Sequence, residues 1–178
     1  MAKYRRYRKY TRRRHIWSSR LQNFSGEQSA TAGNNFIIYY NLCSNPIQSQ
    51  DTVSQKYTVK NINCQMEITS TTSTNYHFVE NLQAFICFIP QGYIPTGTPS
   101  AYADVPYNHP EWIMAHRYFG SVLKEDLPNY PPLRLRTRLA RKLDTGDRVV
   151  LIVLGKNNSS DSTSIAYQGI VKYVTKAN

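Results

Sequence analysis

The chain has 178 residues, with 22 Lys or Arg against 11 Asp or Glu and a formal net charge of +11 at neutral pH. Its longest apolar runs, 84–89 and 149–154, are far too short to cross a bilayer as a helix, so we expect no membrane insertion. Fourteen Tyr, with many Thr, Val and Ile, favour β-structure over helix.

The positive charge is concentrated at the start of the chain. The first twenty residues carry nine Lys or Arg and no acid, whereas the rest holds thirteen basic and eleven acidic side chains. Like charges repel, and aliphatic residues are almost absent here, so residues 1–30 are predicted to be a disordered arm and tether, with a flexible Ser/Gly/Asn/Gln stretch at 22–35. Residues 31–178 are expected to form one domain.

The guanidinium group of arginine binds phosphate through paired N–H donors, and aromatic rings stack on unpaired bases. The arm is therefore predicted to bind single-stranded nucleic acid without sequence preference. A nuclear-import signal is a compatible second use of the same residues. The candidate binding residues are Lys3, Tyr4, Arg5, Arg6, Tyr7, Arg8, Lys9, Tyr10, Arg12, Arg13, Arg14, Trp17 and Arg20.

After the arm, apolar and alternating runs predict seven strands. They cover residues 36–43, 57–69, 82–89, 116–123, 133–139, 148–154 and 165–174. Strict alternation through the second run places Thr58, Lys60 and Ile62 on its buried side. Long loops are expected at 92–110 and 128–132, with Pro110 opening a short helix after Asn108 or His109. Both loops are expected to lie on the surface.

One strand carries a second basic feature. Leu133, Leu135, Thr137 and Leu139 alternate with Arg134, Arg136 and Arg138, and Arg141 and Lys142 would extend the same patch. The three arginines could meet nucleic acid, pair with acids such as Glu125 and Asp126 or with a neighbouring subunit, or be solvated.

Seven or eight strands without a long helix predict an all-β fold. We expect an eight-stranded antiparallel jelly roll of two packed sheets, with an immunoglobulin-like sandwich as the alternative.

No enzyme motif is present: the sequence has no H-E-x-x-H, C-x-x-C, G-x-S-x-G or P-loop, so no enzyme, no metal and no cofactor is predicted. A calcium ion at the turn 144–147 is a weaker alternative. Cys43, Cys64 and Cys87 are expected to be free thiols, mostly buried.

The order of these segments resembles the capsid proteins of small circular Rep-encoding single-stranded DNA viruses, the circovirus-like group. The arm is followed by LQAFICFIPQG, EWIMAHRYFGSVLKED and RLARKLDTGDRVVLIVLG, with a basic run from Arg138 into Gly146 and Asp147 as the most specific part. The chain is shorter than many such proteins and its arm is less densely basic. Coat proteins of plant satellite necrosis viruses share the layout.

The resemblance implies a subunit of a T=1 icosahedral shell of sixty copies, with the arm pointing inward onto the genome. It also implies localisation to the virion and, during assembly, to the host nucleus, with a host import receptor and a cell-surface receptor as partners. DNA is the favoured genome. The alternatives are the coat protein of an RNA satellite virus and a non-viral single-strand-binding β-domain with a basic tail.

Overall fold

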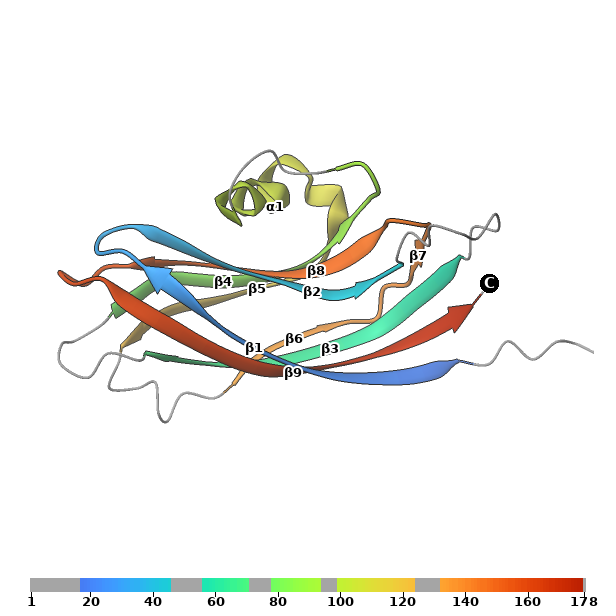
Figure 1. Ribbon diagram of the computed structural model, residues 1–178, viewed down its shortest axis with the longest axis horizontal. Coiled ribbons are helices and arrows are strands. Elements are labelled where there is room, and N and C mark those ends of the chain that lie inside the picture. Colours follow the sequence, from blue (N-terminus) through green and yellow to red (C-terminus); the bar gives the residue numbers. More distant parts are fainter. Residues whose placement is uncertain (1–16, 46–55, 71–77, 94–98, 124–131, 178) are drawn as a thin grey trace, which may run out of the picture.

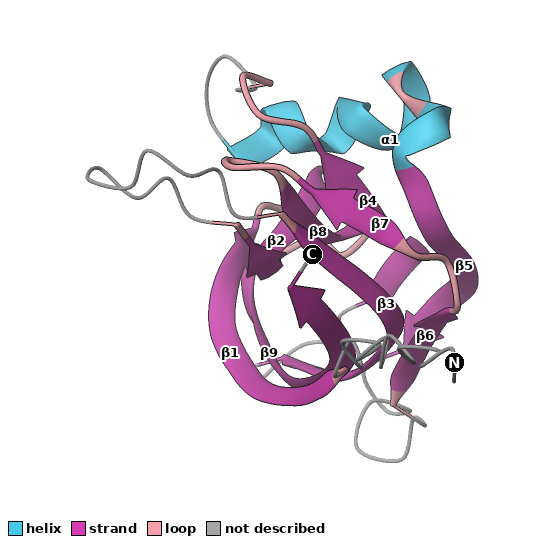
Figure 2. Cartoon of the chain, turned by 90° about the vertical axis from the view of Figure 1, so that its right-hand side faces the viewer, coloured by secondary structure: helices cyan, strands magenta, loops and turns pink. Residues whose placement is uncertain are grey.

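The computed structural model describes residues 17–45, 56–70, 78–93, 99–123 and 132–177. These residues form two antiparallel sheets packed face to face (Figure 1). Viewed along the strands, both sheets curve around a shared core (Figure 2). The strands are β1 (Ser18–Ala30), β2 (Asn35–Ser44), β3 (Tyr57–Ser70), β4 (Phe78–Ile89), β5 (Ile113–Leu123), β6 (Leu133–Thr137), β7 (Arg141–Leu143), β8 (Arg148–Asn157) and β9 (Thr163–Ala177).

The strand pairing is that of a jelly roll. One sheet, called sheet A here, has the order β1-β9-β3-β6, with β7 also paired to β3; the other, sheet B, has the order β2-β8-β4-β5. Because β6 and β7 pair with successive parts of β3, they occupy one strand position. When β6 and β7 are counted as one strand, eight strands remain. The first pairs with the last, the second with the seventh, the third with the sixth and the fourth with the fifth. That nesting is a single long hairpin rolled into two sheets, which confirms the predicted eight-stranded jelly roll.

The first strand was not expected. Residues 18–30 were predicted to belong to the disordered arm and tether. This is wrong, because β1 pairs with β9 along its whole length, from Ser18 with Thr175 to Ala30 with Thr163. Phe24 and Ala30 are buried on the side that faces sheet B. Leu21 lies outward, and inward positions such as Gln22 and Gln28 are polar, so hydrophobic alternation is too weak to reveal a strand. The basic arm before residue 17 lies outside the described residues.

A bulge in β3 reverses the predicted faces at its start. The register shifts between Lys60 and Asn63, and Asn61 lies in the left-handed region with φ of 53°. A bulge places one extra residue against the partner strand, so the alternation changes phase there. Val59 is therefore fully buried, and Lys60 points outward from sheet A. The strict alternation that placed Lys60 on the buried side is wrong on that strand's first residues.

A second apolar cluster lies on the far side of sheet B. The predicted loop after β4 contains three short helical turns, Pro99–Asp104, α1 (Val105–Asn108) and Pro110–Trp112, which lie over sheet B (Figure 1). Val105 is fully buried against Ile37, Phe85 and Ile152. Sheet B is therefore covered on both faces, which explains the continuous apolar run of β8. Pro110 opens its turn directly after His109, as predicted.

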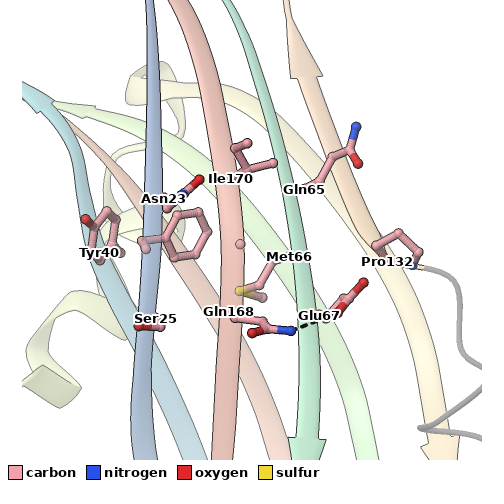
Figure 3. Close-up of a pocket in the computed structure, with 11 residues that line it drawn as sticks. Asn23, Ser25, Tyr40, Gln65, Met66, Glu67, Pro132, Gln168 and Ile170 are labelled. Atoms are coloured by element: carbon pink, nitrogen blue, oxygen red, sulfur yellow. Dashed lines mark hydrogen bonds between the residues drawn. The ribbon is translucent and has the colours of Figure 1, made fainter.

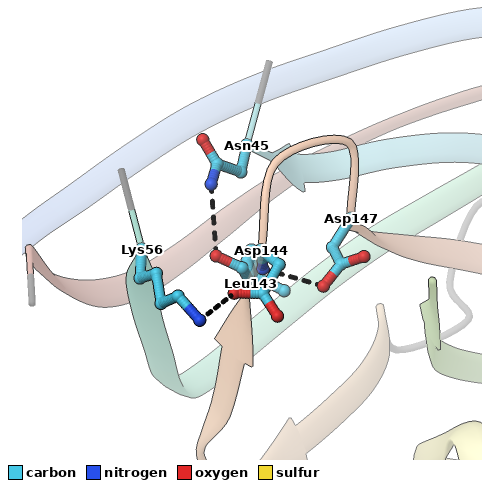
Figure 4. A network of polar contacts seen from close by, with 5 residues as sticks. All are labelled: Asn45, Lys56, Leu143, Asp144 and Asp147. Atoms are coloured by element: carbon cyan, nitrogen blue, oxygen red, sulfur yellow. Dashed lines mark hydrogen bonds and ion pairs between the residues drawn. The ribbon is translucent and has the colours of Figure 1, made fainter. Parts of the chain in front are cut away.

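The turn between β7 and β8 is fixed by one carboxylate. Asp147, 6% exposed, accepts hydrogen bonds from the backbone N–H groups of Gln91 (2.7 Å) and Asp144 (2.8 Å). Asn45 donates to the carbonyl of Leu143 at 3.1 Å, and Lys56 pairs with Asp144 at 3.1 Å (Figure 4). The oxygens suggested for calcium therefore bind protein groups, and the turn ties the end of β2 to the β7–β8 connection.

Candidate nucleic-acid interface

Among the described residues no element covers the outer face of sheet A, and the rows of this face follow from the strand register. One row crosses the sheet through Arg136, Asn63, Lys172 and Leu21, and the next through Arg134, Gln65, Ile170 and Asn23. The side chains between these positions, such as Cys64, Leu135 and Val171, are buried toward sheet B. Residues of one row lie on the same face of the sheet, so their side chains form one surface.

Six cations gather on this face, which we call the basic face. All occupy outward positions of β3, β6, β7 or β9. They are Lys60, Arg134, Arg136, Lys142, Lys172 and Lys176. The acids of the same face, Glu27 and Glu67, lie toward its far end, where they bond Ser164 and Gln168. Within the described ranges Lys56 forms an ion pair with Asp144, and His109 lies within hydrogen-bond distance of Glu111. Neither contact uses a cation of this face.

Trp17 marks the end of the basic face where the chain enters β1. The Lys60 ammonium lies 3.7 Å from the centroid of its ring, and the Lys176 ammonium lies 5.8 Å from the same centroid. The side chain is 37% exposed. An accessible indole beside two ammonium groups can stack on an unpaired base while the ammonium groups bind the phosphates of the same strand. The predicted arm therefore enters the fold beside the basic face.

A shallow groove of about 590 Å³ continues the basic face between β1, β9 and β3 (Figure 3). Asn23, Ser25 and Gln65 supply amide and hydroxyl groups to its rim, and Pro132 lies at one side. Glu67 adds one carboxylate, which accepts a hydrogen bond from the Gln168 amide at 3.1 Å. Gly169 lets the Phe24 ring pack against the β9 backbone, because a Cβ at this position would overlap that ring. Uncharged polar groups beside a row of cations can bind base edges as well as phosphates.

The structure brings together some of the predicted residues. Arg134, Arg136, Lys142 and Trp17 share the basic face with Lys60, Lys172 and Lys176. The predicted residues from Lys3 to Arg14, and the suggested partners Glu125 and Asp126, lie outside the described residues.

Three predicted residues lie elsewhere. Arg20 pairs with Tyr173 on the side toward sheet B, and Arg141 donates to the Glu111 carbonyl at 2.9 Å and lies 5.5 Å from the Phe88 ring. Arg138 is exposed but follows the end of β6, where the Leu139 N–H turns back to the Thr137 hydroxyl at 3.1 Å. The prediction that the strand continues to residue 139 is therefore wrong, and Arg138 does not extend the row.

Sequence reasoning missed Lys60, Lys172 and Lys176. Lys172 and Lys176 are four residues apart and so share a face of β9, which is a signal that alternation alone could have found. Lys60 was hidden by the bulge at Asn61. The near-neutral composition of the folded part also concealed the face, because a net charge does not show how the charges are distributed.

Other chemistries have little support in the parts of the chain that the structure describes. No group of three or more His, Cys, Asp or Glu side chains there could hold a metal ion. No helix among those residues is long and apolar enough to cross a membrane. Burial raises the pKa of Cys43, Cys64 and Cys87 to about 12, so these free thiols are poor nucleophiles at neutral pH.

Comparisons with known proteins give distant structural neighbours. No protein-family model matches the chain, and no curated protein does. A solved structure titled Desmodium yellow mottle tymovirus shares 12% identity over 89% of this chain and 83% of its own, with a TM-score of 0.35. A single-particle structure of maize chlorotic mottle virus shares 12% identity over 89% and 93%, with a TM-score of 0.33.

Proposed function

We propose that this chain is a viral capsid protein that assembles into a closed shell and packages single-stranded nucleic acid. The observation that carries the proposal is the joint placement of three features. The fold is a single jelly roll, a unit from which viral shells are built. Eight Lys or Arg residues precede β1 in the sequence, within residues 1–16. The outer face of sheet A is basic beside that entrance.

In more detail, the proposed shell is a T=1 particle of sixty copies around a DNA genome. Sixty arms (residues 1–16) with eight cations each would bring about 480 positive charges to the interior, enough to neutralise a large share of a small genome's phosphates. The six cations of the basic face would line the wall from which the arms emerge. The same arm would serve as the import signal that brings the subunit to the host nucleus, and receptors would recognise the opposite surface.

A second candidate function has an observation in its favour. A non-viral single-strand-binding domain would need a basic surface with an aromatic group on the folded part itself, and Lys60 with Trp17 provides one. The two candidates differ in assembly, since a binding domain works as a monomer or small oligomer.

The deciding experiment is electron microscopy of the purified full chain, combined with its absorbance ratio at 260 and 280 nm. We expect uniform spherical particles with an absorbance ratio that shows retained nucleic acid. A monodisperse monomer that carries nucleic acid would instead support the binding domain. Nuclease digestion of the extracted nucleic acid with DNase or RNase separates the DNA genome from the RNA satellite alternative.

A further inference from the structure

A cavity of about 420 Å³ opens along one seam of the jelly roll, where the edge of sheet B meets the edge of sheet A. It is lined by β5 at Ala115, His116 and Arg117, and by β6 at Arg134, Leu135 and Arg136. The lining thus includes three arginines, and no carboxylate is among its described residues. The His116 ring is turned away from the cavity, because it stacks on Phe85 on the far side of sheet B. Such a concentration of positive charge favours an anion.

Arg117 is the residue that makes the seam more than an extension of the basic face. It pairs with Ala84 on the side of sheet B that faces sheet A, and its Nη1 donates to the Arg134 carbonyl at 3.3 Å. Its guanidinium also lies 5.2 Å from the Phe119 ring. Both contacts hold the fork at the seam while its remaining N–H groups stay available for another acceptor.

The two β6 arginines also keep free donors. Arg136 uses its Nε to donate to the Asn63 side chain at 3.3 Å, which leaves its two terminal nitrogens. The guanidinium of Arg134 has no hydrogen-bond partner among the residues that the structure describes. Three partly or wholly unused forks around one cavity match the oxygens of a phosphate group, which can accept several charge-assisted hydrogen bonds at once.

The backbone adds donors to the same place. The carbonyl of Arg134 points into the seam, since Arg117 reaches it from β5. In a strand the N–H and C=O of one residue point to the same side, and residues two apart repeat that direction. The N–H groups of Arg134 and Arg136 therefore also point into the seam, away from β3.

We infer that the seam between β5 and β6 is a phosphate-binding site, formed by the side chains of Arg117, Arg134 and Arg136 and by the outward N–H groups of β6. The inference rests on the proposed function only for the carrier of the phosphate, which is then a backbone phosphate of the packaged strand. The site itself follows from the cavity and its donors. A free phosphate ion has the same chemistry, so the experiment separates the two sources.

The first arm of the experiment uses the full chain, washed free of nucleic acid at high salt, and inorganic phosphate at constant ionic strength. The phosphate Kd is obtained from the rise of the unfolding midpoint with phosphate concentration. In Arg117→Gln we expect the Kd to weaken about tenfold, because one charge-assisted fork is lost. Lys156→Gln removes the same charge from β8 in sheet B, outside the seam, and should leave the Kd unchanged.

Arg136→Gln provides an independent variant, since it leaves the Arg117–Arg134 contact intact, and it should weaken phosphate binding to a similar extent. Circular dichroism checks the fold of each variant. An equal phosphate Kd in the wild-type chain, both arginine variants and Lys156→Gln would overturn the site.

The second arm uses a labelled oligothymidylate and measures how its affinity falls with salt. A phosphate of the strand in the seam predicts that Arg117→Gln lowers the slope of log K against log salt by about 0.7, the contribution of one phosphate contact in a single strand. An unchanged slope together with weakened inorganic phosphate binding assigns the site to free phosphate. Absence of particles and of retained nucleic acid contradicts the proposed function and leaves the inorganic phosphate result standing.

Discussion

Deletion of residues 1–16 separates the contribution of the arm from that of the basic face. The cut keeps Trp17 and the whole of β1, whereas a cut after residue 20 would remove three residues of a strand that pairs with β9 throughout. It removes eight Lys or Arg residues and leaves the six cations of the basic face. The cations of the arm and those of the basic face can therefore be counted separately.

The expected effect follows from counterion release. Each phosphate neutralised in a single strand contributes about 0.7 to the slope of log K against log salt. With all fourteen cations engaged the full chain reaches a slope of about 10, and the truncated chain one of about 4. These are upper limits, since each cation is counted as one phosphate contact. The difference between the two proteins is nonetheless several units, well within reach of measurement.

Fluorescence anisotropy of a labelled oligothymidylate between about 50 and 300 mM salt measures both slopes, and circular dichroism confirms that the truncated chain is folded. Removing Lys60 and Lys172 from the truncated chain by substitution with Gln should lower its slope further, to about 3. A truncated chain whose binding no longer depends on salt would refute a role for the basic face. An unchanged slope after truncation would refute the arm as the packaging element.

Three further predictions concern the fold. Gly155→Ala places a Cβ 2.5 Å from the Phe36 ring, so we expect urea unfolding to show a loss of about 1–3 kcal/mol, smaller in a Phe36→Ala background. Asp147→Ala leaves two backbone N–H groups without their acceptor and should cost about 2–4 kcal/mol, seen as a lower Tm; an unchanged Tm would contradict the role of the turn. Burial raises the thiol pKa of Cys64 and Cys87 from 9.0 to about 12. Between these two pH values the thiols are deprotonated in the unfolded chain but still protonated in the folded one. Stability should then fall by up to about 1.4 kcal/mol per pH unit for each thiol, and a Cys64→Ala/Cys87→Ala variant should show a shallower alkaline loss.

The sequence predicted those parts of the fold where burial follows a simple period. The strand at β6 was found because Leu133 and Leu135 alternate with Arg134 and Arg136, and the two-sided burial of β8 was visible as an apolar run. The strand β1 was missed for the opposite reason. Few of its side chains are large and apolar, and its backbone is held by β9, a partner about 140 residues away in the sequence.

The candidate site was predicted only in part, because the pairing of strands brings together residues that are far apart in the sequence. Arg136 and Lys172 share a row although 36 positions separate them, and no local pattern indicates that pairing. Arg117 is a similar case: its neighbour Arg134 lies on the other sheet, across a seam that exists only once the hairpin is rolled. The order of the strands suggested the topology of the fold. It did not show which residues of two distant strands would lie side by side.

The contrast between the two outer faces gives the proposed shell an orientation. The outer face of sheet B is apolar and covered by residues 99–112. No described element covers the outer face of sheet A, which holds six cations beside the entrance of the arm. An uncovered surface of like charge is repelled by its copies in neighbouring subunits unless an anion lies between them. In a closed shell the natural position for sheet A is therefore inward, against the packaged strand. Assembly should accordingly depend on nucleic acid at low salt and become independent of it as salt screens the face.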